Sequence, residues 1–284
     1  MKVLKAKRAG FCFGVKRAID MAFEIAEERS NGVVTLGPII HNPQMIEKLK
    51  DAGIPYINDV AEIKSLNGVK TAIIRTHGIP LEDIQRLEEM GVEIIDATCP
   101  FVKKAQDYAR LLNENDYTVV ILGNKKHPEV RGILSFAGEK AIVVKDASEY
   151  PNVSGRVGVI VQTTKHRDDL KAVLTVAIEH AKELRVFNTI CNYTDLKRKE
   201  TEELASQVDI MLVVGGKNSA NTRRIAKLSR SLSVATYHIE TAEEIKEEWF
   251  ENVNTAGVTA GASTPDWIID EVIKRLKDIG GDEG

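Results

Sequence analysis

Three cysteines divide the 284-residue chain into nearly equal parts, and a similar succession of residues follows each one. Cys12, Cys99 and Cys191 are 87 and then 92 residues apart, and each lies between a short apolar segment and a helix-like segment. A second apolar segment follows each cysteine and ends in a glycine 24 or 25 residues on. These glycines are Gly37, Gly123 and Gly215. Periods of about 20 to 50 residues are typical of solenoids, so this longer period instead predicts three small, similar domains.

The three thiols point to a shared metal centre. A buried cysteine taken singly is more often a small hydrophobic residue, but Cys12, Cys99 and Cys191 occupy equivalent places in the repeat. Three thiolates are one ligand short of a closed tetrahedral site, which is typical of a catalytic centre with an open position. An odd number of cysteines also argues against a disulfide framework.

The predicted fold class is α/β. Short β-branched segments alternate with segments of helical periodicity along the whole chain, a pattern typical of parallel sheets covered by helices. We expect three small domains, at residues 13–97, 98–190 and 191–284, arranged with pseudo-threefold symmetry around the shared centre. The third domain lacks one strand, and the N-terminal segment 1–12 is expected to supply it.

Polar side chains follow the predicted strands, at the sheet edge where ligands of α/β proteins bind. They are His41, His77, His127, Glu129, Thr163, Ser219, Asn221 and Ser263. Imidazoles, hydroxyls and an amide with a single carboxylate suit a small anion such as a phosphate or diphosphate. Glu129 is the expected proton carrier, with a raised pKa.

Other polar residues are given ordinary roles. His166, His180 and His238 have no repeat partner and are interpreted as caps or turn residues. The charged runs at 197–203 and 244–251 are interpreted as solvated helix faces. No Walker loop or G-x-G-x-x-G fingerprint is present, so we expect no nucleotide cofactor.

Composition narrows the classes of partner. The net charge of −3 gives no reason to expect nucleic acid or an anionic membrane as a partner. No apolar run approaches the ~20 residues needed to span a bilayer, and no secretory signal is recognisable at the N-terminus. The expected location is the cytoplasm.

Nine segments, in order, resemble the LytB/IspH family of 4-hydroxy-3-methylbut-2-enyl diphosphate reductases. They are AGFCFGVKRAI, GPIIHNP, TAIIRTHGIP, DATCPFVKKA, GNKKHPEV, VQTT, NTIC, GKNSANTRR and AGASTPDWII. The resemblance covers residues 1 to about 275. It implies three α/β domains in a trefoil around a 4Fe–4S cluster. It also implies reduction of the hydroxylated allylic diphosphate to isopentenyl and dimethylallyl diphosphate, the last step of the non-mevalonate pathway.

The resemblance also implies a role for each candidate residue. Cys12, Cys99 and Cys191 would hold three irons, and the fourth iron would take the substrate hydroxyl. The diphosphate ligands would be His41, His77, Ser219, Asn221 and Ser263. His127 would contact the substrate, Thr163 would relay protons and Glu129 would supply them. A ferredoxin or flavodoxin would supply the electrons.

Two departures and three alternatives accompany this interpretation. Ala220 stands where many relatives have a second serine, and Tyr193 stands where many have a small residue. The first alternative is another three-cysteine 4Fe–4S enzyme of the quinolinate synthase type. The second is a non-enzymatic iron–sulfur or zinc sensor, and the third is a small-phosphate-binding protein, which leaves the cysteines unexplained.

Overall fold

The computed structural model describes residues 1–29, 31–40, 42–66 and 68–281. Contacts divide the chain into two compact units. Unit 1 comprises Met1–Lys16, Ile40–Leu49 and Asn192–Gly284, and unit 2 comprises Arg17–Ile39 and Lys50–Cys191. The boundaries of the three predicted domains stay a prediction.

Within the described residues, the strands form three parallel sheets of four strands each, which confirms the predicted α/β class. The first sheet has the order β3 (Tyr56–Ile57), β2 (Val33–Leu36), β4 (Thr71–Ile74), β5 (Glu93–Asp96). The second has the order β7 (Ile142–Val144), β6 (Thr118–Leu122), β8 (Gly155–Val161), β9 (Ala181–Phe187). The third has the order β11 (Ala235–Ile239), β10 (Ile210–Val214), β12 (Thr255–Ala260), β1 (Lys2–Lys5).

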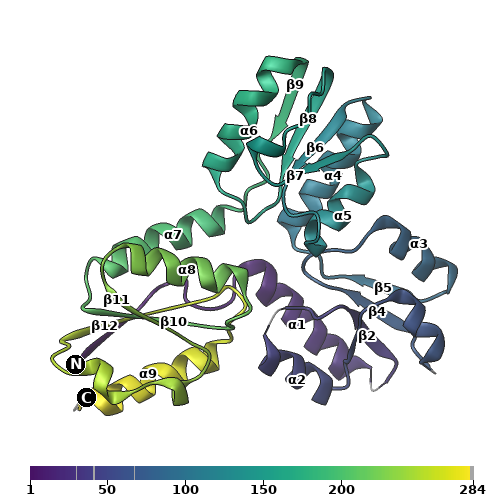
Figure 1. Ribbon diagram of the computed structural model, residues 1–284. Coiled ribbons are helices and arrows are strands. Elements are labelled where there is room, and N and C mark those ends of the chain that lie inside the picture. Colours follow the sequence, from purple (N-terminus) through teal and green to yellow (C-terminus); the bar gives the residue numbers. More distant parts are fainter. Residues whose placement is uncertain (30, 41, 67, 282–284) are drawn as a thin grey trace. The chain divides into compact units, whose positions relative to one another are not determined.

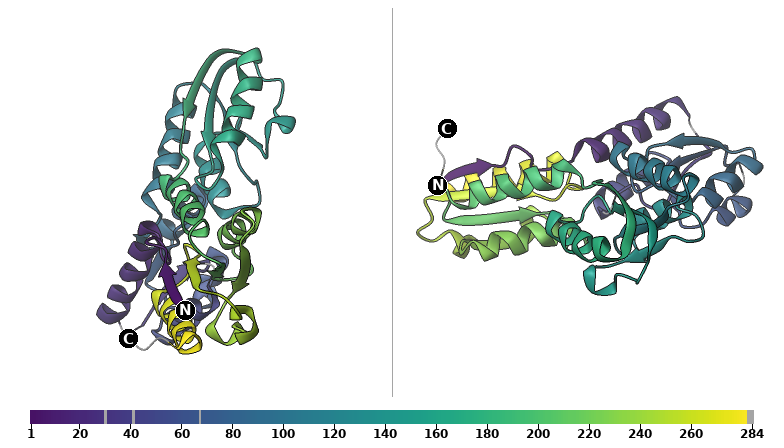
Figure 2. Two further views of the ribbon diagram at one scale, coloured as in Figure 1. Left: turned by 90° about the vertical axis from the view of Figure 1, so that its left-hand side faces the viewer. Right: turned by 90° about the horizontal axis from the view of Figure 1, so that it is seen from above.

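The three sheets share one topology. In each, the strand after the repeat's first helix lies second in the order, and the last position is taken by β5, β9 or β1. The N-terminal strand β1 pairs in parallel with β12, with Lys2 opposite Thr255. The N-terminal amine also donates a hydrogen bond to the Gly280 carbonyl, 3.1 Å away at the end of the last helix (Figure 2).

The helices connect the strands in the βαβ manner that parallel sheets require. They are α1 (Phe13–Glu28), α2 (Pro43–Asp51), α3 (Leu81–Glu89), α4 (Pro100–Glu114), α5 (Pro128–Phe136), α6 (Arg167–His180), α7 (Asn192–Ala205), α8 (Ala220–Ser231) and α9 (Asp266–Gly280). Short 3-10 turns lie at η1 (Val60–Ser65), η2 (Ala147–Glu149), η3 (Ala242–Glu244) and η4 (Glu247–Phe250).

The second sheet shows why these sequences form buried strands. Successive residues of β6 point to opposite faces, and both faces are apolar. Val119 and Ile121 pack in a core cluster with residues of α4 and α5, whereas Val120 and Leu122 pack in a cluster with residues of α6. Figure 1 shows the sheet between these helices.

The third sheet has the same two-sided cover. In Figure 1, α7 and α8 lie along one face and α9, drawn in yellow, lies along the other. Every residue of β10 is buried, and its run of Ile, Met, Leu and Val is the continuous apolar pattern expected of a central parallel strand.

Candidate iron–sulfur and diphosphate site

The backbone of each cysteine is held in the same way. Its amide donates to a carbonyl two residues beyond the end of a central strand. Cys12 N–H donates to Ala262 (3.3 Å), Cys99 N–H to Thr76 (3.0 Å) and Cys191 N–H to Thr163 (2.8 Å). These carbonyls follow β12, β4 and β8 respectively. The internal repeat predicted from spacing is therefore present in the hydrogen bonding.

This equivalence corrects one pairing within the repeat. The spacing matched His77 with Thr163 as equivalent strand ends, but Thr163 is equivalent to Thr76. His77 is equivalent to Thr164 and Ser263, each three residues beyond its strand. Counting from the cysteines alone does not fix this register, because the loops between strands and helices differ by single residues.

Each cysteine also lies directly before a helix. Cys12 precedes α1, Cys99 is the N-cap residue of α4, and Cys191 precedes α7. The unsatisfied amides of a helix N-terminus favour negative charge nearby, so all three positions favour a thiolate. None of the cysteines is fully buried and none forms a disulfide in the described part of the chain, which disagrees with a role as a small core residue.

The fit of a cluster rests on this donor chemistry. Among the described residues, no group of three or more His, Cys, Asp or Glu side chains forms a metal site, and the cysteines divide between the units, with Cys12 in unit 1. Thiolates suit iron–sulfur clusters or zinc and do not suit hard cations. Three equivalent thiols at helix N-termini thus fit a cluster with three protein ligands.

Glu129 is the buried carboxylate of unit 2. Its side chain is 2% exposed, one oxygen accepts from the Thr163 amide at 2.6 Å, and the other accepts from the Thr163 hydroxyl at 3.0 Å. Burial raises the pKa of Glu129 to about 7, and the two bonds from Thr163 oppose this increase. A carboxyl group tuned to near neutrality can donate a proton and recover it, as the sequence analysis expected.

Two histidines accompany this carboxylate. His127 caps α5, because its Nδ1 accepts from the Glu129 amide at 3.2 Å, and the neutral ring then carries its proton on Nε2. The rings of His77 and His127 meet edge to face with centroids 5.5 Å apart. The structure thus brings together four predicted residues of unit 2, which are His77, His127, Glu129 and Thr163.

Unit 1 carries the other predicted polar residues. Ser219 caps α8 by accepting from the Thr222 amide at 3.3 Å, and the first turn of α8 contains no acidic residue. The Nδ2 atom of Asn221 is buried without a hydrogen-bond partner in the described structure. An orphaned amide at a helix N-terminus is what an anion site provides before its ligand binds.

The loop that carries Ser263 packs against the start of this anion site. Thr264 Oγ1 donates to the Val214 carbonyl at 3.0 Å, and a Cβ on Gly215 would lie 2.4 Å from the same Oγ1. Gly215 also has a φ of 137°, a conformation that other residues rarely adopt. His41, predicted to bind the diphosphate, lies outside the described residues.

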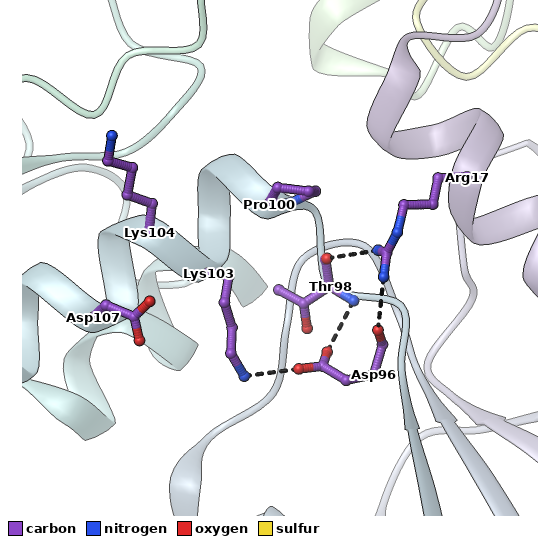
Figure 3. Close-up of a pocket in the computed structure, with 7 residues that line it drawn as sticks. All are labelled: Arg17, Asp96, Thr98, Pro100, Lys103, Lys104 and Asp107. Carbon is purple, nitrogen blue, oxygen red and sulfur yellow. Dashed lines mark hydrogen bonds and ion pairs between the residues drawn. The ribbon is translucent and has the colours of Figure 1, made fainter.

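The turn that presents Cys99 borders a surface hollow of about 270 Å³. Figure 3 shows its lining residues: Arg17, Asp96, Thr98, Pro100, Lys103, Lys104 and Asp107. Arg17 of α1 donates to the carbonyls of Thr98 (3.2 Å) and Asp96 (3.4 Å). The helix that follows Cys12 therefore braces the turn that carries Cys99.

One charged residue at the site was missed. Lys197 belongs to a run interpreted as a solvated helix face, but it is only 2% exposed, so that interpretation is wrong for this residue. The signal was available in the sequence, because Lys197, Thr201 and Leu204 share one face of α7 with helical spacing. Tyr193, one of the two departures, lies one turn before Lys197. Nothing is described of the Ala220 side chain.

Sequence comparison identifies close relatives over nearly the whole chain. A family model described as LytB protein matches residues 3–277. A 4-hydroxy-3-methylbut-2-enyl diphosphate reductase of Trichlorobacter lovleyi is 49% identical over 281 residues, covering 98% of this chain and 99% of that protein. A protein of the same name from Pelobacter propionicus is 50% identical over 281 residues with the same coverage.

Solved structures agree. A structure of (E)-4-hydroxy-3-methyl-but-2-enyl diphosphate reductase, described as the terminal enzyme of the non-mevalonate pathway, matches with a TM-score of 0.79 and 44% identity. The match covers 98% of this chain and 100% of that one. The Plasmodium falciparum reductase matches with a TM-score of 0.85 over 97% of this chain and 88% of its own, but at 23% identity it shows the fold alone.

Proposed function

Because the chain belongs to the LytB family, we propose that it is a 4-hydroxy-3-methylbut-2-enyl diphosphate reductase. The reaction breaks the allylic C–O bond of the substrate and consumes two electrons and two protons. One proton leaves with the hydroxyl group as water, and the other is added to an allylic carbon. The products are isopentenyl and dimethylallyl diphosphate.

The cofactor is a 4Fe–4S cluster with Cys12, Cys99 and Cys191 as its protein ligands. The equivalent placement of the three thiols at helix N-termini supports this assignment. When bound, such a cluster supplies single electrons and an open iron that acts as a Lewis acid. The protein contributes binding, orientation and protons.

The diphosphate binds through neutral donors and a helix N-terminus. The residues assigned to it are His41, His77, Ser219, Asn221 and Ser263. The buried, unpartnered Nδ2 of Asn221 supports this assignment, because a donor in that position is left unsatisfied until an acceptor arrives. The acid-free first turn of α8 also favours a ligand with several negative charges.

Glu129 supplies protons, and Thr163 holds it in place while His127 contacts the substrate. The observation that carries this assignment is the chain of hydrogen bonds from Glu129 through Thr163 to the backbone of Cys191. It connects the one buried acid of the site to the backbone of a cysteine expected to bind the cluster. With a pKa of about 7, Glu129 is protonated often enough at neutral pH to act as a general acid.

The reductant is a one-electron carrier of the ferredoxin or flavodoxin class, and the reaction takes place in the cytoplasm. Thiols that form no disulfide support a reducing compartment. Within the described residues, no helix is long and apolar enough to cross a membrane. Membership in the LytB family also separates the chain from a quinolinate synthase, from a metal sensor and from a simple phosphate-binding protein.

Anaerobic turnover tests the proposal. Protein reconstituted with iron and sulfide is mixed with (E)-4-hydroxy-3-methylbut-2-enyl diphosphate and reduced methyl viologen. We expect viologen oxidation, two electrons per substrate, with isopentenyl and dimethylallyl diphosphate as the products. Protein that holds its cluster but leaves the substrate unchanged contradicts the proposal.

A further inference from the structure

Lys197 occupies a core position of α7. It is 2% exposed and shares the buried face of the helix with Thr201 and Leu204. Lysine is rarely buried unless a negative group accompanies it, because removing an ammonium group from water is costly. A compensating partner is therefore expected near its Nζ.

No carboxylate fills that role. Among the described residues, Lys197 forms no ion pair within 4 Å with Asp or Glu. Its Nζ lies 3.5 Å from the Tyr193 hydroxyl and 5.3 Å from the centroid of the same ring. A phenol and its ring stabilise a cation but do not neutralise it.

Tyr193 connects this lysine to the segment that leads to Cys12. Its hydroxyl lies 3.0 Å from the Arg8 carbonyl and 3.3 Å from the Gly10 carbonyl, to which it can donate. Glu200 binds the same segment, because its carboxylate accepts from the Arg8 amide at 3.0 Å. One face of α7 therefore packs on the residues just before Cys12.

The negative groups that act on Lys197 are Cys12 and then Glu200. Burial lowers the pKa of Lys197 to about 7, and the charges of Cys12 and Glu200 oppose this decrease. Glu200 is already engaged by the amide of Arg8, and its carboxylate lies 4.0 Å from the Arg8 guanidinium. The sulfur of Cys12 is therefore the partner that Lys197 complements.

We propose that Lys197 is the outer-sphere cation of the Cys12 ligand, held there by Tyr193. The inference rests on the proposed function, since Cys12 is one of the ligands assigned to the cluster. A fixed positive charge beside one thiolate stabilises the reduced cluster, which carries one more negative charge than the oxidised one. Lys197 thereby raises the reduction potential and eases electron entry. It is a positioning residue, since it acts through Cys12.

The reduction potential of the cluster tests this role. Lys197→Met keeps the length and apolar stem of the side chain, Lys197→Arg keeps the charge, and Tyr193→Phe removes the hydroxyl. Lys199→Met is the matched control, because Lys199 is exposed on the same helix and carries the same charge. Potentials are measured by anaerobic redox titration followed by electron paramagnetic resonance, with iron content determined on the same samples.

We expect Lys197→Met to make the potential more negative and Tyr193→Phe to shift it less in the same direction. Lys197→Arg and Lys199→Met should stay close to the parent. A Lys197→Met protein with full iron content and the parent potential overturns the inference, whatever its activity.

A variant that does not retain iron is judged by a second measurement. In the metal-free full chain, alkylation by iodoacetamide is followed separately at Cys12, Cys99 and Cys191 by peptide mass spectrometry. We expect Lys197→Met to slow the reaction at Cys12 by about threefold to tenfold, because loss of the cation reduces the thiolate fraction. The other two cysteines are internal controls. An unchanged rate at Cys12 contradicts the inference even if the parent holds no cluster, so this outcome is independent of the proposed function.

Discussion

Thr163 binds Glu129 twice, through its amide at 2.6 Å and through its hydroxyl at 3.0 Å. The same residue accepts a hydrogen bond from the Cys191 amide at 2.8 Å. Movement of the carboxylate is therefore coupled to the backbone of a cysteine proposed to bind the cluster. This arrangement fixes the acid with respect to Cys191 and predicts that proton supply and cluster binding can be separated by mutation.

Glu129→Gln is expected to lower turnover by about 10²- to 10⁴-fold while the cluster and substrate affinity are retained. The amide keeps the shape of the side chain and its bond to the Thr163 amide, but it cannot act as a general acid. Steady-state viologen oxidation gives the turnover, and iron content and substrate titration give the other two properties. Glu139→Gln, at an exposed position of the same unit, is the control. Normal turnover in Glu129→Gln removes this carboxylate from the mechanism.

The free energy of unfolding of the metal-free protein is expected to fall as the pH rises from about 4.5 to about 7. In this range the unfolded chain has released the proton of Glu129, whereas the folded chain retains it because burial raises the pKa to about 7. The folded state therefore binds more protons, and its stability decreases with pH. The full cost above pH 7 is about 3 kcal/mol.

Urea unfolding of parent and Glu129→Gln at pH 5 and pH 8 measures this contribution. The difference in stability between the two proteins should favour the variant more strongly at pH 8. A pH-independent difference means that Glu129 is not the group responsible.

Asn221→Ala is expected to weaken substrate binding by about 10-fold or more, because a hydrogen bond to a charged group contributes about 1.5–3 kcal/mol. The stability of the free protein should not decrease, since the Nδ2 atom has no partner to lose in the described structure. Calorimetric titration with substrate and thermal unfolding without it give the two values. Asn221→Asp should bind still more weakly through charge repulsion. Unchanged affinity in both variants places the diphosphate elsewhere.

Arg17→Met is expected to destabilise the protein by about 1–2 kcal/mol and to accelerate the loss of iron. Arg17 is the side chain that joins α1 to the carbonyls of Asp96 and Thr98 in the turn before Cys99 (Figure 3). Two hydrogen bonds from a charged donor are lost on substitution. Lys104→Met is the matched control, because Lys104 lines the same hollow but its ammonium group faces the Tyr108 ring. Equal iron loss in the two variants argues against this bracing role.

The sequence predicted the α/β class because its signals are local. The β-branched run of β10 and the glycine after it each indicate a buried strand end, and both recur at matched distances from the cysteines. The candidate acid was also recognisable, because Glu129 is the one carboxylate among the polar residues that follow the strands.

The remaining features depend on contacts that are distant in sequence. The equivalence of Thr163 with Thr76 follows from hydrogen bonds to cysteines 28 and 23 residues away. Likewise, Lys197 looks like a surface residue within a charged run, and only its packing against the segment before Cys12 shows that it is buried. Charge patterns describe composition, whereas burial is decided by tertiary packing.

The central claim is that three cysteines hold a 4Fe–4S cluster with one iron open to substrate. The most direct test is iron and sulfide analysis with Mössbauer spectroscopy of anaerobically purified protein, before and after addition of (E)-4-hydroxy-3-methylbut-2-enyl diphosphate. We predict about four irons and four sulfides per chain, with one iron site changing its spectrum when substrate is added. Zinc or no metal in protein never exposed to oxygen contradicts the account.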